Sequence, residues 1–395
     1  MAVTACVVLT ISNGLSITGL SVFDEAILSE FDWTRGELKF RDMITFSVSA
    51  VLAPFGGIII DRLGVKRSML IGWVLLAIAY LIYSDIQSLT GLYTAHAILG
   101  VVLVFCGLNP AIILVSSWFQ EKRGIAIGIT LVGTSLGGVL FPQYGTYLSE
   151  MVGWRSTMNY SIVFPALMFV LVALWIQDGP ESTSETDAPA LTQGLSYLEA
   201  LQSRAFWAIS IIAMTTFYTV LGVQAHIFLY LRDLNFSPAV ATNAISLFFS
   251  CAVVGKFVFG LLADYINYRH VFYGNTVIML VGSICLAMMN PNLIWVAIVV
   301  FGLGWGGVYT TIQLSAVNCF GLVSAGKILG TIAVLDCFGG GLGIWLTGEF
   351  YSQYGNYQLA FTIFAILIAV ALVGISQIVP PTASQARAQV AEPTV

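Results

Sequence analysis

Two ionisable side chains, Lys256 and Asp336, lie within long runs of apolar residues. An unpaired charge is expensive to bury in such surroundings, so an ionisable group kept there usually has a function. A lysine ammonium can bind an anion, and a carboxylate can take up and release a proton. We therefore predict that Lys256 binds a substrate and that Asp336 serves proton coupling. The alternative is a fixed ion pair that only ties two helices together, although such a pair is seldom more stabilising than an apolar one.

An internal duplication singles out the same two residues. The segment Gly57-Ile-Ile-Ile-Asp61 returns 203 residues later as Gly260-Leu-Leu-Ala-Asp264. Four glycines repeat at a shift of 202 residues, and they suit helices whose backbones approach closely: Gly128, Gly137, Gly138 and Gly153 correspond to Gly330, Gly339, Gly340 and Gly355. In these alignments Lys256 replaces Ala53 and Asp336 replaces Thr134. A duplicated scaffold gains function where its halves differ.

The two charges are predicted to lie at nearly the same depth. Lys256 precedes Asp264 by eight residues, and Asp336 follows Lys327 by nine. At a helical rise of about 1.5 Å per residue, both lie about 12–13 Å from the same end of their helices. We expect Lys256 and Asp336 to approach one another.

The elements that carry these residues are predicted to span a lipid bilayer. The chain is 58% hydrophobic and 9% charged, with a mean hydropathy of +0.91. An average soluble domain has roughly 25% charged residues. Twelve apolar runs are long enough to cross a hydrocarbon core of about 30 Å. Their predicted starts are Thr4, Phe40, Ser68, Thr90, Gly124, Tyr160, Ala205, Pro238, Val271, Asn292, Ala325 and Gln358.

Polar stretches divide the chain into two six-helix halves. We expect an N-terminal bundle over 1–176, a cytoplasmic linker over 177–203, a C-terminal bundle over 204–379 and a disordered cytoplasmic tail over 380–395. Lysine and arginine favour the side that holds both termini, nine to five, which predicts a cytoplasmic membrane protein with both termini in the cytoplasm. In this count Lys39 and Arg41 belong to an outer loop, which leaves Lys256 as the one basic residue inside a span.

The loop after the second span carries the most specific pattern in the chain. It reads Gly57-Ile-Ile-Ile-Asp61-Arg62-Leu-Gly64-Val-Lys66-Arg67. This run resembles the loop signature of the major facilitator superfamily. The resemblance implies an all-α integral membrane protein with twelve helices in two pseudo-symmetric bundles, monomeric action, and transport by alternating access. It also implies a gating role for Gly57, Asp61, Arg62, Gly64 and Lys66, with Asp264 as a weaker counterpart in the second half.

Further runs resemble one branch of that family, the bacterial monocarboxylate porters and oxalate/formate antiporters. They include Glu30-Phe31-Asp32-Trp33-Thr34-Arg35, Gly255-Lys256 and Gly302-x-Gly304-x-Gly306-Gly307-Val308-Tyr309. In that branch an arginine typically follows the glycine at 255 and holds the substrate carboxylate. Lysine is a point donor without the planar fork of arginine. The branch often places an acid one turn earlier, where this chain has Ala252.

The resulting hypothesis is a carrier for a small organic anion, with a monocarboxylate the expected substrate, coupled to protons. When a proton and an anion are both bound, the site carries the same net charge as the empty pair, so the loaded carrier can reorient. Four further side chains are predicted to orient the substrate or to pack between helices: Tyr309, Asn109, Asn13 and Tyr218. His226 is a second candidate for proton coupling, or else an interfacial histidine. Asp24 and Glu25 are candidates for the entrance of the path or for a solvated helix end.

Other functions fit the sequence less well. The three histidines are far apart, the six cysteines are single, and there is no nucleophile motif, so we expect neither an enzyme nor a cofactor or metal site. A net charge of −5 provides no basic patch for nucleic acid. The remaining alternatives are a proton-independent anion exchanger, a uniporter for another polar solute, and a transporter-like nutrient sensor.

Overall fold

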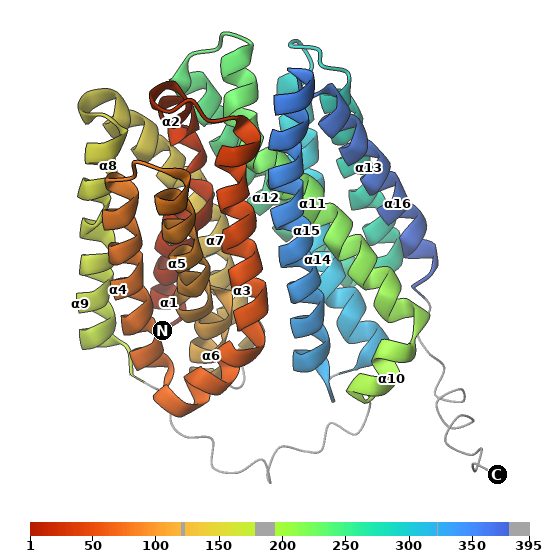
Figure 1. Cartoon of the computed structure of the whole chain (residues 1–395). Coiled ribbons are helices and arrows are strands. Elements are labelled where there is room, and N and C mark those ends of the chain that lie inside the picture. The colour runs from red at the N-terminus through yellow and green to blue at the C-terminus, as the bar shows by residue number, and fades with distance from the viewer. Residues whose placement is uncertain (120–122, 178–193, 322, 379–395) are drawn as a thin grey trace, which may run out of the picture.

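The chain folds into two helical bundles that stand side by side (Figure 1). The computed structural model describes residues 1–119, 123–177, 194–321 and 323–378. Twelve helical segments in this part of the chain are long and apolar enough to cross a membrane, as predicted. Ten of the twelve begin within a few residues of the predicted starts. The expected tail, Lys122 and most of the expected linker lie outside the described residues.

The N-terminal bundle contains six spans, three of which are interrupted. The first comprises α1 (Ala2–Asn13), a π-helical turn (Gly14–Thr18), a short 3-10 turn (Ser21–Phe23) and α2 (Asp24–Glu30). The others are α3 (Arg35–Leu63), α4 (Val65–Ser84), α5 (Leu89–Cys106) with α6 (Leu108–Trp118), α7 (Arg123–Val152), and α8 (Trp154–Ser161) with α9 (Val163–Trp175).

The C-terminal bundle repeats this arrangement with fewer interruptions. A short helix, α10 (Tyr197–Gln202), precedes α11 (Arg204–Asp233), α12 (Pro238–Tyr265), α13 (Tyr268–Ala287), α14 (Ile294–Phe320), α15 (Ala325–Tyr354) and α16 (Gln358–Ser376). The two bundles meet mainly through α3 against α15 and α7 against α12. We call the end where α1 begins and α16 ends the terminal end, and the opposite end, where α3 begins, the distal end.

The repeated glycines Gly137 and Gly339 occupy equivalent places in the two bundles. A methyl group added to Gly137 would lie 2.7 Å from the Thr10 carbonyl oxygen on α1, and one on Gly339 would lie 2.5 Å from the Met214 carbonyl oxygen on α11. Helices α7 and α15 therefore approach the first helix of their own bundle as closely as glycine allows. Gly128 and Gly330 differ from this expectation, because nothing lies within 4 Å of a methyl group added at either position.

The second span begins earlier than the sequence analysis predicted. Helix α3 starts at Arg35, where Thr34 and Glu37 form a capping box. Lys39 and Arg41 therefore lie inside a membrane span, and both are fully buried. The prediction that Lys256 is the one basic residue within a span was wrong. The buried carboxylate of Asp24 makes this burial possible, because it pairs with both cations.

Candidate functional site

Lys256 lies on α12 and reaches across to the other bundle. Its Nζ donates to Ser135 Oγ at 2.9 Å and to Thr134 Oγ1 at 3.3 Å, both on α7. It also lies 5.6 Å from the centre of the Tyr309 ring on α14, within the range of a cation–π contact. Within the described part of the chain, no carboxylate lies within 4 Å of Lys256. The ammonium thus has hydroxyl and aromatic partners and no counter-ion.

Asp336 lies on α15 with 6% of its surface exposed. Its Oδ1 atom has no hydrogen-bond partner among the described residues. The carboxyl group interacts electrostatically with Tyr309, the same ring that Lys256 faces. Lys256 and Asp336 therefore do not form a direct ion pair in this conformation, although both lie near Tyr309. The expected approach of Lys256 to Asp336 is therefore not a direct contact between the two charged groups.

The duplication explains the position of Lys256. Thr134, which accepts a hydrogen bond from Lys256, occupies on α7 the position that Asp336 occupies on α15. The contact of α12 with α7 is thus the pseudo-symmetric counterpart of the contact of α3 with α15. Thr134 and Ser135 were not predicted as partners of Lys256, although Thr134 aligns with Asp336 in the duplication.

The aromatic and amide candidates are dispersed. Tyr309 packs against Trp305 and Phe217, with ring centroids 5.5 and 6.0 Å apart, and stays next to Lys256. Tyr218 packs against Phe364, within the C-terminal bundle. The remaining two lie in the N-terminal bundle, Asn13 half-buried at the end of α1 and Asn109 exposed at the start of α6. The structure thus brings one of these four candidates, Tyr309, together with Lys256.

His226 belongs to a separate network at the distal end. Its Nε2 lies 2.9 Å from the Ile344 carbonyl oxygen, which can only accept, so Nε2 carries the hydrogen. In the neutral ring Nδ1 is then an acceptor, and the Tyr357 hydroxyl lies 3.2 Å from it. Tyr357 in turn accepts a hydrogen bond from Arg35 at 2.6 Å. Both ring nitrogens have partners as a neutral imidazole, so His226 ties α11 to α15 and to Tyr357, the N-cap residue of α16.

Several polar contacts join the two bundles at the distal end. Arg35 forms a bidentate ion pair with Asp233, and Arg232 forms one with Glu25. Lys39 donates to the Ala225 carbonyl oxygen at 2.7 Å. Hydroxyl and amide groups of α7 and α12 add further bonds: Thr146 with Thr242, and Gln143 with Asn243 and Ser246. We call these interbundle contacts the distal gate, and all of them lie on the distal side of Lys256.

The predicted gating loop lies at the terminal end. Helix α3 continues to Leu63, and Gly64 alone separates it from α4 with a φ of 81°, a value that favours glycine. Arg62 is exposed, and a methyl group added at Gly57 would meet nothing within 4 Å. Asp264 is also exposed. The side chain of Asp61 lies outside the described residues, and Lys66 is half-buried with an interaction partner. The gating role of this loop stays a prediction.

Known proteins resemble this chain over most of its length. The family model of the Major Facilitator Superfamily matches residues 6–344 and 232–394. Among curated proteins, an uncharacterized MFS-type transporter YhjX of Escherichia coli (strain K12) is 24% identical over 322 residues, 80% of each chain. Monocarboxylate transporter 13 of Bos taurus is 24% identical, covering 88% of this chain and 81% of its own. An oxalate:formate antiporter of Oxalobacter formigenes is 22% identical, covering 89% of this chain and 87% of its own.

The fold is also similar to that of a solved transporter. A bacterial homolog of the human lysosomal transporter Spinster, in an inward-facing and occupied conformation, superposes with a TM-score of 0.74. The two chains are 14% identical, and the match covers 95% of each.

Proposed function

This chain belongs to the Major Facilitator Superfamily, and we propose that it carries a small organic anion, bound through Lys256, by proton-coupled alternating access. Membership makes it a multi-pass membrane transporter and not an enzyme. The observation that carries the proposal is the ammonium group of Lys256, which lies between the bundles and has no counter-ion within 4 Å in the described part of the chain. A positive charge in such a place is suited to a negatively charged ligand.

The chemistry of Lys256 favours a carboxylate of small size. Its present partners, Ser135 and Thr134, are hydroxyls that an anion can displace at the cost of ordinary hydrogen bonds. Tyr309 faces the ammonium with its ring, and its hydroxyl can donate or accept a hydrogen bond to orient the ligand. Relatives named as a monocarboxylate transporter and an oxalate:formate antiporter support this class of substrate.

Asp336 supplies the proton-binding group of the proposal. A single proton on its carboxyl group cancels the negative charge that would oppose an anion near Lys256. The loaded site then carries the same net charge as the empty one, and this balance permits reorientation inside a bilayer. Asp336 is suited to bind this proton because its Oδ1 is buried and, among the described residues, has no hydrogen-bond donor that would hold the carboxylate ionised.

The arrangement of contacts corresponds to one state of the transport cycle. Polar contacts hold the bundles together from Lys256 to the distal end. Beyond Lys256 toward the terminal end, Gly128 and Gly330 have open space beside them. We assign the terminal end to the cytoplasm, as the count of basic residues predicts, so that this state is open toward the cytoplasm.

Two alternatives within transport remain, and a third is a sensor. A proton-independent exchanger would use Lys256 alone, and a uniporter for another polar solute would use neither charge. A transporter-like nutrient sensor would bind the anion without moving it.

Uptake into proteoliposomes separates these possibilities. Radiolabelled lactate, pyruvate, acetate and oxalate are supplied with and without an inward proton gradient, to the wild type and to Lys256→Ala. The proposal predicts gradient-driven uptake of at least one acid that Lys256→Ala loses. Lys327→Ala, which removes an exposed lysine at the terminal end of α15, is the matched control. Equal uptake by the wild type and Lys256→Ala would overturn the proposal.

A further inference from the structure

A second group of buried charges lies at the distal end, apart from Lys256. Lys39 and Arg41 on α3 both pair with Asp24, the first residue of α2, and the Lys39 pair measures 2.5 Å. Asp42 lies 3.6 Å from Arg41 Nε and 3.9 Å from His96 Nδ1. Two cations thus balance two carboxylates, all in a membrane span and 8% exposed or less. Burying four charged side chains in this way costs free energy. A role in holding helices together does not by itself explain that cost.

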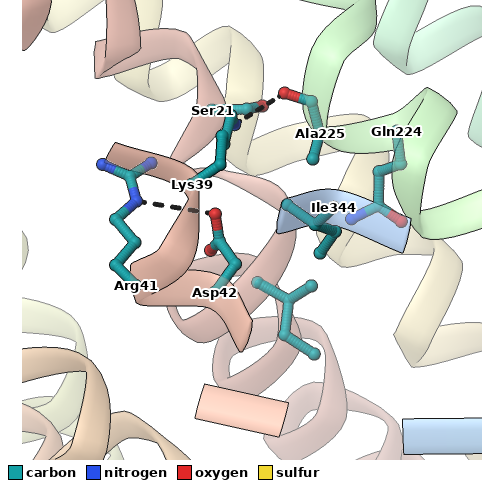
Figure 2. A pocket seen from close by; sticks show the side chains of 8 residues that line it. Ser21, Lys39, Arg41, Asp42, Gln224, Ala225 and Ile344 are labelled. Carbon is teal, nitrogen blue, oxygen red and sulfur yellow. Dashed lines mark hydrogen bonds and ion pairs between the residues drawn. The ribbon is translucent and has the colours of Figure 1, made fainter. Parts of the chain in front are cut away.

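A small cavity connects this group to the interface between the bundles. Its volume is about 10 Å³, which is close to the space of one water molecule. Ser21, Lys39, Arg41 and Asp42 line it from the N-terminal bundle, and Gln224 and Ala225 on α11 line it from the other (Figure 2). The cavity therefore lies within the distal gate, where the bundles must part for the path to open at this end.

Hydrogen-bond donors converge on this cavity. Arg41 and Ser21 line it, and Arg41 Nε and Ser21 Oγ are buried without a hydrogen bond among the described residues, Arg41 Nε having only the 3.6 Å ion pair with Asp42. Lys39 Nζ points to the Ala225 carbonyl oxygen of the opposite bundle (Figure 2). Buried donors without partners are costly, so the group is suited to an acceptor that is absent in the closed gate. Lys39, Arg41 and Ser21 can donate hydrogen bonds to an anion here, while Asp24 and Asp42 offset the two positive charges.

We propose that this cavity becomes a second binding station for a small carboxylate when the distal gate opens. Parting of the bundles removes Ala225 from Lys39, since the two residues belong to different bundles. The carboxylate takes the place of the carbonyl oxygen on Lys39 and accepts from Ser21. The station rests on the proposed function for its class of ligand, and it lies on the distal side of Lys256 along the same path.

Asp42 lowers the affinity of the proposed station for an anion. Its carboxylate lines the cavity and repels an anion, while Lys39 and Arg41 attract it. Asp24, His96 and Tyr83 contact these charges as well, and the Tyr83 hydroxyl oxygen accepts a hydrogen bond from Arg41 Nη1 at 2.6 Å. A transport path needs sites that bind strongly enough to attract the ligand and weakly enough to release it.

A binding station and a simple latch predict opposite effects for the same variant. If Lys39 only held the two bundles together through its bond to Ala225, Lys39→Gln would favour the distal-open state. The substrate would then bind more tightly from the distal side. If Lys39 binds the carboxylate, Lys39→Gln removes a charged partner, and binding from that side weakens. Arg35→Gln is the matched control, because Arg35 lies one turn away on α3 and its pair with Asp233 crosses the same gate.

The test measures KM separately from each side in proteoliposomes of one orientation. The probe is the acid, among lactate, pyruvate, acetate and oxalate, that the wild type takes up fastest. We expect Lys39→Gln to raise the distal KM about ten-fold, the usual worth of a hydrogen bond to a charged group, and to leave the terminal KM within about two-fold. Arg35→Gln should lower the distal KM or leave it unchanged.

Each outcome separates the station from the proposed function. An unchanged or lowered distal KM in Lys39→Gln overturns the station and leaves the role of Lys256 intact. A raised distal KM in Lys39→Gln, with normal transport by Lys256→Ala, supports the station and overturns the proposed function. Absence of saturable uptake of all four acids by the wild type overturns both. Lys39→Arg, which keeps the charge, should restore most of the distal affinity if the protein is folded.

Discussion

At the scale of single residues, Lys256 is held by partners that compete with a ligand. Ser135 Oγ accepts the shorter of its two hydrogen bonds, at 2.9 Å. An anion that binds Lys256 must replace this bond. The hydroxyl therefore lowers the apparent affinity for the anion unless it contacts the anion itself.

Replacing Ser135 with alanine should strengthen anion binding. The competing hydrogen bond contributes about 0.5–1.5 kcal/mol, so we expect the dissociation constant to fall about two- to ten-fold. Equilibrium binding of the labelled acid to purified protein in nanodiscs measures the change. Ser250→Ala, on an exposed face of α12, is the control. Weaker binding in Ser135→Ala would show that the hydroxyl contacts the anion directly.

Asp336 gives a second prediction at this scale. Asp336→Asn keeps the shape of the side chain and removes its ability to exchange a proton. We expect this variant to exchange labelled for unlabelled acid across the membrane but to lose accumulation driven by a proton gradient. Counterflow and gradient-driven uptake, measured on the same vesicles, separate the two activities. Gradient-driven accumulation at the wild-type level would remove Asp336 from the coupling mechanism.

The sequence placed Lys256 and Asp336 correctly within spans, but it did not do so for the charges at the distal end. Lys256 and Asp336 stood out because each replaces an uncharged residue of the other half. Lys39 and Arg41 were placed outside the membrane because they lie near a predicted helix end. The capping box of Thr34 and Glu37 was a readable signal that α3 starts at Arg35. The pairing of Lys39 and Arg41 with Asp24 depends on tertiary structure, so the sequence alone did not predict it.

At the scale of helices, glycines set how closely neighbours pack. A methyl group added at Gly306 on α14 would lie 2.1 Å from the Ala252 carbonyl oxygen on α12. That carbonyl is one turn before Lys256, so this contact fixes the helix that carries the site. Gly330 on α15 has open space instead.

The pair Gly306→Ala and Gly330→Ala tests this packing. We expect Gly306→Ala to destabilise the protein by about 1–3 kcal/mol, because backbone atoms must move apart. Gly330→Ala should be neutral or stabilise by up to about 1 kcal/mol, since alanine favours a helix. Thermal unfolding in detergent gives both values. A similar loss of stability in the two variants would contradict the packing described for α12 and α14.

The number and order of the helices followed from apolar length, whereas their interruptions did not. Twelve spans were predicted, and twelve are present in the described part of the chain. The breaks at Gly107 and within the first span, where a π-helical turn covers Gly14–Thr18, come from local backbone geometry. Average hydropathy does not contain that information.

At the scale of the whole molecule, the distal gate holds the bundles in one relative orientation. Arg35 and Asp233 form its bidentate ion pair, with side chains 13% and 32% exposed. In the proposed transport cycle this pair is broken when the distal end opens, so we expect it to bias the choice between the two states. The pair of Arg155 with Glu30 has a similar length, 2.7 Å, but lies within one bundle.

Breaking the interbundle pair should therefore change the conformational equilibrium. We expect Asp233→Asn to raise the population of the distal-open state, because the contacts it weakens are absent there. Distances between spin labels on the distal ends of α3 and α11 measure that population. Glu30→Gln, which breaks the pair inside one bundle, should leave the distances unchanged. Equal distance distributions in Asp233→Asn and the wild type would contradict the gate.

The central claim is that Lys256 binds the transported anion, and its affinity is the most direct measurement. Equilibrium binding of the best-transported acid is compared between the wild type and Lys256→Gln in nanodiscs. Loss of a charged hydrogen-bond donor predicts a dissociation constant at least about ten-fold higher in the variant. A value within about two-fold of the wild type would show that the anion binds elsewhere.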